Sequence, residues 1–325
     1  MMETKKYIYQ KLFIIILTII NLFIIIFHPN NQYYISPKSS MIIEPNFEYN
    51  KYQKDIITEE LYIKSDCELS LNQAYFLNGI IRKHMPKNCL EIGVSRGGSS
   101  ILILNAIKDI QGSQLVSLDL NTMYYKDPSI KTGWRVNNFF PNLTKKWSLY
   151  TGDQPHKFLM KLNLKLDFLF LDTAHISPGE LFNMIEAMPF LNDNAIIVLH
   201  DIKLHCTRIN QKNELYAKIN PTNFHLMTFL YGDKILLKTS QKTIDNMGAI
   251  FLYKNQKSHY LEYFFSLISI WDYIPSDDHL KDMKNFIISY YQEESLVDMF
   301  NEAVSFNKAF FKKFNKTDFK FFNSK

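Results

Sequence analysis

The middle of the chain alternates short apolar runs with stretches in which apolar residues recur at helical spacing. Each run ends in Gly, Asp or His-Asp, and the runs are Cys89–Ile92, Leu115–Leu118, Phe168–Leu171 and Ala195–Leu199. Helical stretches at Ser99–Lys108 and Gly179–Met188 lie between them. Buried apolar runs separated by helices are typical of a parallel sheet covered on both faces. The pattern therefore predicts an α/β fold, a three-layer α/β/α sandwich around a mostly parallel sheet.

Further elements flank this core on both sides. Before it, apolar residues at helical spacing begin at Leu69 and predict a helix. After it, two β-like runs, Lys234–Lys238 and Gly248–Tyr253, complete the domain. Aromatic-rich amphipathic stretches at Leu280–Tyr291 and Ser295–Phe311 then predict a helical C-terminal extension, whose role the sequence does not reveal.

The N-terminal segment contains a long uncharged apolar run. It extends from Leu12 to Phe27, and Lys5, Lys6 and Lys11 precede it. At about 1.5 Å per residue, a helix of this length covers nearly the hydrocarbon core of a bilayer. The prediction for residues 1–28 is an uncleaved membrane anchor. A cleaved signal peptide is the alternative, although the run is not followed by a cleavage site with small residues.

The domain plan follows from these boundaries. Residues 29–64 lack sustained periodicity and are predicted to be a tether, residues 65–255 the main domain, and residues 256–325 the helical extension. The protein is therefore expected to be located in a membrane, which it crosses once. The side of the domain stays open, because the lysines before the apolar run favour an N-terminus inside, whereas Lys38, Lys51 and Lys54 flank its other end.

Composition narrows the function classes. The chain has 325 residues, and an apolar fraction of 46% excludes a mostly disordered protein. The net charge of +5 is spread along the chain rather than gathered in a stripe, so no nucleic-acid partner is expected. Cys67, Cys89 and Cys206 form no CxxC pair, so the fold does not depend on disulfides.

A glycine-containing turn follows the first apolar run. The sequence from Glu91 is EIGVSRGGSS, in which a strand turns through glycines into a helix. Glycine is needed where the backbone approaches a ligand closely or takes a positive φ, and a helix start offers free N–H groups. The spacing is neither that of a dinucleotide fingerprint nor that of a phosphate-binding P-loop. A turn that only lets strand and helix pack is the alternative. The candidate cofactor-binding residues here are Glu91, Gly93, Ser95, Gly97, Gly98 and Ser99.

Two further carboxylates lie at predicted strand ends. Asp119 follows the second apolar run, where a carboxylate can accept both hydroxyls of a ribose. Asp153 ends the next strand and can accept a hydrogen bond from an adenine amino group. The alternatives are a helix cap or turn residue for Asp119 and an Asx turn before Pro155 for Asp153.

The order of these segments resembles a known family. Glu91-Ile92-Gly93, Asp119, Gly152-Asp153, the segment FLDTAH ending at His175 and the segment VLHDI ending at Ile202 follow the pattern of class I S-adenosylmethionine-dependent methyltransferases. They look most like the branch that includes cephalosporin-hydroxylase-like and macrolide O-methyltransferases. The resemblance implies a Rossmann-like, seven-stranded sheet. It also implies S-adenosylmethionine as cofactor, with Glu91 and the glycine turn near its methionine end, Asp119 on its ribose and Asp153 near its adenine.

A cluster of acidic residues and histidines is predicted at the carboxyl edge of the sheet. Metal-using members of the family place an Asp after the fourth strand and an acidic pair after the fifth. Asp172 matches the first position and Asp201 the second member of the pair, while His200 replaces the first member. Because neighbouring strand ends lie about 5 Å apart, Asp172 and Asp201 can converge there, joined by His175 and His200.

Two chemistries and one structural role fit this cluster. Asp172, His200 and Asp201 can hold a divalent ion such as Mg²⁺ or Mn²⁺, with mixed ligands favouring a softer ion than Mg²⁺. In the second reading, His175 or His200 is a general base positioned by the carboxylates. In the third, His200 only packs and Asp201 caps a helix.

The function that the resemblance implies is methyl transfer from S-adenosylmethionine. The expected acceptor is a hydroxyl of a sugar or another small polar molecule, so the expected partners are a small-molecule or glycan acceptor and the membrane. One alternative is a catalytically silent, membrane-tethered binding module that keeps the nucleotide-binding fold. Another is a metal-dependent, hydroxylase-like enzyme on the same fold. The sequence indicates no oligomeric state.

Overall fold

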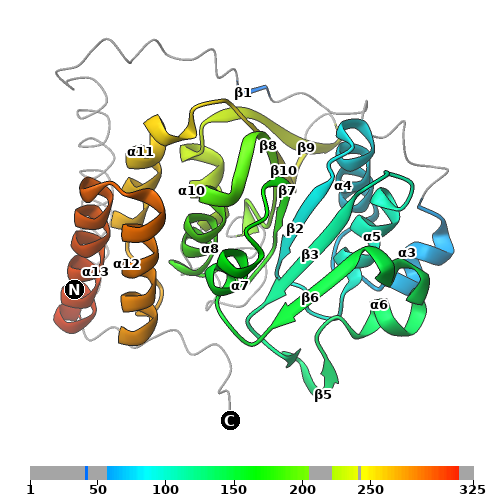
Figure 1. The fold of residues 1–325 in the computed structure, drawn as a ribbon, viewed down its shortest axis with the longest axis horizontal. Helices are drawn as coiled ribbons and strands as arrows, with labels where there is room; N and C mark the ends of the chain where they lie inside the picture. The colour runs from blue at the N-terminus through cyan, green and yellow to red at the C-terminus, as the bar shows by residue number, and fades with distance from the viewer. Residues whose placement is uncertain (1–40, 43–56, 205–221, 241–242, 315–325) are drawn as a thin grey trace, which may run out of the picture. The chain divides into compact units, whose positions relative to one another are not determined.

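The computed structural model describes residues 41–42, 57–204, 222–240 and 243–314 (Figure 1). The apolar run from Leu12 to Phe27 lies outside these residues, as do Cys206 and most of the predicted tether. Among the helices of the described residues, none is both long enough and apolar enough to cross a membrane.

One twisted mixed sheet forms the centre of the fold (Figure 1). Its strand order is β1-β9-β10-β8-β7-β2-β3-β6, and only β10 runs antiparallel to its neighbours. The strands are β1 (Met41–Ile42), β2 (Asn88–Ile92), β3 (Gln114–Asp119), β6 (Trp147–Thr151), β7 (Leu166–Leu171), β8 (Leu191–His200), β9 (Gly232–Ser240) and β10 (Thr243–Leu252). The prediction of a mostly parallel seven-stranded sheet is confirmed, and the two-residue β1 adds an edge strand beside β9.

The side chains of the central strands alternate between two buried layers. Leu90, Leu169 and Ile197 belong to one hydrophobic cluster. Their chain neighbours Cys89 and Phe168 belong to the other. Successive residues of a strand point to opposite faces, so continuous apolar runs fill both layers at once.

Helices cover both faces of the sheet (Figure 1). Residues of the first four described helices join the layer that contains Cys89, and these helices are α3 (Glu59–Ser65), α4 (Leu71–His84), α5 (Gly98–Ile107) and α6 (Trp134–Phe139). Residues of the later helices join the layer that contains Leu90, and these are α7 (Pro155–Leu162), α8 (Gly179–Ala187), α10 (Thr222–Phe229), α11 (Tyr260–Phe265), α12 (Asp277–Tyr291) and α13 (Glu294–Phe314). The predicted three-layer sandwich is therefore present.

The helical C-terminal part shares its core with the sheet. Phe264, Trp271 and Phe300 are fully buried in the same cluster as Leu169 of β7. Phe182 of α8 lies edge-on to Trp271, with ring centroids 5.6 Å apart. The predicted helices are present, and they are packed against α8 rather than appended to it. The domain boundary at residue 255 itself stays a prediction.

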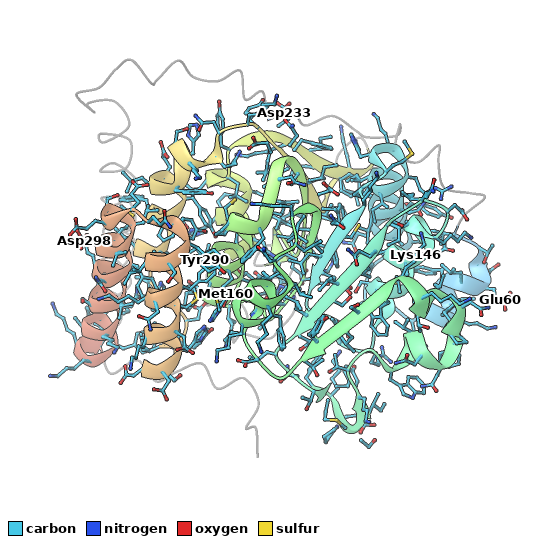
Figure 2. The ribbon with its side chains drawn as sticks, viewed as in Figure 1. Glu60, Lys146, Met160, Asp233, Tyr290 and Asp298 are labelled. Atoms are coloured by element: carbon cyan, nitrogen blue, oxygen red, sulfur yellow. The ribbon has the colours of Figure 1, made fainter. Side chains whose placement is uncertain are left out.

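Several short elements were not predicted. The helix α3 lies within the stretch expected to be a tether, and a small two-stranded sheet, β4 (Met123–Tyr124) with β5 (Asp127–Lys131), precedes α6. Such short elements show no amphipathic period, and contacts with the rest of the domain hold them in place. Lys146, just before β6, makes another such contact: its Nζ donates to the carbonyl oxygens of Ile107, the last residue of α5, and of Ile110 beyond it (Figure 2).

Candidate active site

The glycine turn joins β2 to α5 along a tight backbone path. Gly93, Ser95 and Gly97 have φ angles of 95°, 53° and 94°. Gly97 is the N-cap of α5, and no side chain caps the first N–H groups of this helix. The sequence prediction of glycines at positive φ is correct at both Gly93 and Gly97.

Protein atoms already surround the three glycines. A Cβ atom built on Gly93 would lie 1.8 Å from the carbonyl oxygen of Asp172. One on Gly97 would lie 2.9 Å from the Val136 side chain, and one on Gly98 would lie 2.6 Å from Cys67 Cα. Packing alone therefore explains why these positions need glycine, and their contact with a cofactor stays a prediction.

Glu91 lies beneath the turn and is completely buried. Its carboxylate accepts hydrogen bonds of 2.6 Å from the hydroxyls of Ser99, Ser100 and Ser117. Burial raises the pKa of Glu91 to about 7, although the three hydroxyls oppose this rise. In this arrangement Glu91 and Ser99 tie the start of α5 to β2 and β3. Direct contact of either residue with a cofactor stays a prediction.

Asp119 organises the turn from the end of β3. Its Oδ2 accepts hydrogen bonds from the N–H groups of Val94 at 2.9 Å and Ser95 at 3.0 Å. Its Oδ1 accepts one from the N–H of Asn121 at 2.8 Å. The carboxylate thus connects the glycine turn to the next loop, and its contact with a ribose stays a prediction.

Asp153 is engaged in a salt bridge. Lys157 Nζ lies 3.0 Å from Asp153 Oδ1 and 3.2 Å from Asp282 of α12. Burial would raise the pKa of Asp153, but hydrogen bonds from Lys157 and from the N–H of Gln154 lower it below its usual value. The side chain follows β6 as predicted, and its adenine contact stays a prediction.

The four predicted catalytic residues come together at the carboxyl edge of β7 and β8. His175 Nε2 lies 2.7 Å from Asp201 Oδ2 and 3.5 Å from Asp172 Oδ1. His200 Nδ1 lies 3.2 Å from Asp172 Oδ1 and 3.5 Å from Asp201 Oδ2. The sequence placed these residues at two adjacent strand ends, and the parallel pairing of β7 with β8 joins them.

The structure offers a further candidate ligand for a metal ion, His175. Asp172, His175 and Asp201 each offer one ligand atom, and these atoms lie within 4.8 Å of one another. The sequence proposed His200 with the two aspartates, and His200 Nδ1 also lies within 3.5 Å of both, so this ligand set stays a prediction. The left-handed backbone of His175, with φ 57°, accompanies its place beside them.

Sequence reasoning missed Glu180, in the first turn of α8. Its buried carboxylate lies 2.8 Å from His175 Nδ1 and accepts a hydrogen bond from the N–H of Thr173 at 3.3 Å. The hydroxyl of Thr222 donates to its other oxygen. An acidic residue in a first helical turn usually only complements the helix dipole, so the sequence carried no specific signal for this role.

The loop after β8 is also held by amide side chains. Asn246 Nδ2 donates to Asp201 Oδ1, and Asn246 Oδ1 accepts from the N–H of Lys203 at 2.7 Å. Asn223 Nδ2 donates to the carbonyl oxygen of His200 at 2.6 Å. These contacts hold Asp201 at φ 55°, a conformation that a residue with a Cβ adopts only when its surroundings impose it.

The carboxylates favour protonated imidazoles. Burial would lower the pKa of His175, but the charges of Glu180 and Asp201 raise it well above its usual value. Burial would also lower the pKa of His200, but Asp172 and Asp201 raise it to about 10. Burial would raise the pKa of Asp201, and the two histidines hold it far below its usual value. Without a bound cation, neither imidazole is a ready base at neutral pH.

The central segment is similar to a known protein family. Residues 90–202 match the family model described as a methyltransferase domain. The matched segment runs from β2 to Ile202. It contains the glycine turn, Asp119 and the acidic–histidine cluster, which consists of Asp172, His175, His200 and Asp201.

Solved methyltransferase structures resemble the chain at low identity. One is the O-methyltransferase from Bacillus cereus in complex with SAH, at 17% identity, covering 63% of this chain and 97% of that one with a TM-score of 0.45. TomG from Streptomyces achromogenes, an O-methyltransferase involved in tomaymycin synthesis, is 14% identical; the match covers 61% of this chain and 92% of TomG, with a TM-score of 0.45. A putative caffeoyl-CoA O-methyltransferase from Staphylococcus aureus is 15% identical; the match covers 59% of this chain and 88% of that one, with a TM-score of 0.45. No curated protein matches the chain.

Proposed function

We propose that the protein transfers a methyl group from S-adenosylmethionine to a hydroxyl of a sugar or another small polar acceptor. The observation that carries this proposal is the position of the acidic–histidine cluster directly beside the glycine turn. The N–H of Asp172 donates to the carbonyl oxygen of Ile92 at 3.0 Å, and Gly93 leaves no room for a side chain against Asp172. Groups that can activate a hydroxyl therefore adjoin the turn at which the family binds its cofactor.

The chain supplies groups that suit each part of the cofactor. The uncapped N–H groups at the start of α5 can receive a carboxylate, and Asp119 can accept hydrogen bonds from ribose hydroxyls. The side chain of Leu120, which follows Asp119, is exposed and offers an apolar surface. When bound, S-adenosylmethionine supplies an electrophilic methyl group, so the protein has only to orient the acceptor and remove its proton.

Two ways of removing that proton fit the cluster. Asp172, His175 and Asp201 can hold a divalent ion, which lowers the pKa of a bound hydroxyl. Alternatively, His200 accepts the proton directly while Asp172 orients its ring; this route needs the neutral imidazole, so its rate should rise with pH toward the His200 pKa of about 10. A chelator separates the two readings, because it abolishes the first chemistry and leaves the second unchanged.

The proposal is tested first by cofactor binding. Calorimetry with S-adenosylmethionine and S-adenosylhomocysteine should give saturable binding to the wild type. We expect Asp119→Ala to weaken S-adenosylhomocysteine binding by about 1.5–3 kcal/mol, the scale of hydrogen bonds to a charged group. Asp127→Ala is the control and should bind normally, because Asp127 is a partly exposed Asx-turn residue on β5. A wild type that binds neither compound would support the silent binding module instead.

The second test is transfer itself. Methyl-labelled S-adenosylmethionine is incubated with glycosides, vicinal diols and catechols, and label in the acceptor and S-adenosylhomocysteine are measured together. Equal amounts of both products are expected for methyl transfer to oxygen. Cofactor-independent oxygen consumption would indicate a metal-dependent hydroxylase on the same cluster.

We also propose that residues 1–28 anchor this domain to a membrane as a single span. The support is the uncharged run from Leu12 to Phe27 in the sequence. Extraction of the full chain only by detergent, but not by salt or alkali, is the expected result. A full chain that leaves the membrane fraction in carbonate buffer would refute the anchor.

A further inference from the structure

Both ring nitrogens of His175 face carboxylates. Its Nδ1 lies 2.8 Å from Glu180 Oε1, and its Nε2 lies 2.7 Å from Asp201 Oδ2. A histidine that serves as a general base needs one nitrogen directed at the proton that it removes. The geometry of His175 leaves neither nitrogen directed at an acceptor molecule, so His175 is not arranged as a base.

Glu180 differs from the two aspartates in its surroundings. It is buried behind His175, whereas Asp172 is partly exposed at the strand edge. Its two oxygens are occupied by His175, by the N–H of Thr173 and by the hydroxyl of Thr222. Glu180 accepts a hydrogen bond from Nδ1 of His175, so Nδ1 carries the proton of the neutral ring. The free lone pair is then on Nε2, which lies between Asp172 and Asp201.

We propose that Glu180 is the positioning residue of a carboxylate–histidine–metal arrangement in which His175 Nε2, Asp172 and Asp201 bind a first-row transition ion. The inference rests on the proposed function, whose metal reading it deepens. In such arrangements the outer carboxylate fixes the tautomer and the orientation of the ligand ring. Glu180 does both for His175, and the left-handed backbone of His175 directs the ring toward the two aspartates.

The ligand chemistry sets the class of ion. Mg²⁺ prefers oxygen ligands at octahedral positions and keeps several waters, whereas an imidazole with two carboxylates suits Mn²⁺, Fe²⁺, Co²⁺ or Zn²⁺. The buried carboxylate behind the imidazole further raises the basicity of Nε2 as a ligand. We therefore expect Mn²⁺ to bind more tightly than Mg²⁺ and to be displaced by Co²⁺ or Zn²⁺.

The experiment compares two buried carboxylates of the same helix. Glu180→Gln removes the charge behind His175. Glu186→Gln is the matched control, because Glu186 is also buried in α8 and lies 2.6 Å from Nδ1 of another buried histidine, His156, away from the cluster. Mn²⁺ binding to the full chain is measured by electron paramagnetic resonance, S-adenosylhomocysteine binding by calorimetry, and melting temperature in parallel.

We expect Glu180→Gln to weaken Mn²⁺ binding about 10–100-fold while S-adenosylhomocysteine affinity stays within about twofold. Glu186→Gln should lower the melting temperature but leave Mn²⁺ affinity unchanged. Glu180→Asp, which keeps the charge, should restore part of the affinity. Spin-echo spectra of Mn²⁺ bound to the wild type should show coupling to one imidazole nitrogen, and this coupling should be absent in His175→Gln.

Several outcomes would overturn the inference. Unchanged Mn²⁺ affinity in Glu180→Gln, equal losses in both variants, or no nitrogen coupling in the wild type would each do so. The last measurement needs no variant, so it decides the matter even where Glu180→Gln fails to fold. A wild type that binds S-adenosylmethionine and transfers methyl groups without binding Mn²⁺ refutes this inference and leaves the proposed function intact. Absence of cofactor binding refutes the proposed function instead.

Discussion

Single residues at the turn act mainly by bringing strand ends together. Gly93 lets the end of β2 touch the backbone at Asp172, and Asp119 fixes the next two N–H groups of the turn. Glycine and aspartate therefore carry structural roles at positions where the sequence suggested ligand contact. The two roles are compatible, since a cofactor site needs a rigid turn.

The first residue-scale prediction concerns Gly93. Gly93→Ala should lose on the order of 3 kcal/mol of unfolding free energy or more, because its Cβ would lie 1.8 Å from the carbonyl oxygen of Asp172. Gly112→Ala is the control: it has a φ of 73° but no atom within 4 Å of the new Cβ, so only about 1–2 kcal/mol of backbone strain is expected. Urea unfolding measures both. Equal losses of unfolding free energy in the two variants would mean that the ends of β2 and β7 can move apart to admit the new Cβ.

The second concerns the protonation of Glu91. Its pKa rises from the usual 4.5 to about 7 in the folded protein. The folded state therefore holds a proton that the unfolded chain releases between these values. The contribution of Glu91 to stability is full below about pH 4.5, falls by roughly 3 kcal/mol as the pH rises to 7, and stays level above that.

Replacing the carboxyl group isolates this effect. The difference in unfolding free energy between wild type and Glu91→Gln should change by roughly 3 kcal/mol between pH 4.5 and pH 8, because other titrating groups cancel in the difference. Urea titrations at five pH values measure it. Parallel curves for the two proteins would show that the three serine hydroxyls keep the carboxylate ionised throughout.

At the scale of elements, the sequence predicted the strands and helices that have a clear apolar pattern. It missed the elements whose position depends on tertiary contacts. The strands β2, β3, β7 and β8 lie where continuous apolar runs placed them, because burial on both faces forces such runs. The helix α6 has no such pattern. Its position depends on backbone hydrogen bonds from Gly133 to Ser95 and from Arg135 to Arg96.

The same distinction applies to the site. Asp172 and Asp201 were predicted because each directly follows a strand, so topology alone brings them together. Glu180 was not, because its contact with His175 depends on a left-handed residue and on the first turn of α8. Residue spacing along the chain carries no information on such a bend.

The helix α3 provides an element-scale prediction. Asp66, its C-cap, lies 2.6 Å from both Arg96 of the glycine turn and Arg135 of α6. Asp66→Asn keeps the left-handed backbone preference but removes the charge, so we expect a loss of about 1 kcal/mol, modest because these groups are partly exposed. Hydrogen exchange of the α3 amides should accelerate.

A control lies on the same helix. Glu60, at the outer edge of α3, pairs only with Lys64 one turn away in the described structure, and both side chains are exposed (Figure 2). Glu60→Ala should leave exchange in α3 and stability unchanged. Similar effects in Asp66→Asn and Glu60→Ala would show that the contact with Arg96 and Arg135 does not hold α3.

At the scale of the whole molecule, the C-terminal helices complete the core and hold the loop of His175. Asp272 Oδ2 accepts a hydrogen bond from the N–H of Ser177 at 2.9 Å, and its own N–H donates to the Ser177 carbonyl at 2.8 Å. The neighbouring Trp271 donates its N–H to Asn307 of α13 at 2.8 Å. A continuous series of contacts therefore leads from α13 to the loop before α8.

This arrangement predicts the effect of cutting the chain at the domain boundary suggested by the sequence. A chain ending at residue 255 loses Phe264, Trp271 and Phe300 from the core that it shares with Phe182, and leaves that apolar surface exposed. We expect it to aggregate or to unfold without a cooperative transition, because several large buried side chains, each contributing about 3–5 kcal/mol, exceed the usual stability of a domain. A chain ending at residue 314, which keeps every described helix, should unfold cooperatively as the full chain does. Circular dichroism melts and size-exclusion chromatography compare the two. A 1–255 fragment that stays monodisperse in detergent, unfolds cooperatively and binds S-adenosylhomocysteine would show that the C-terminal helices are a separate appendage after all.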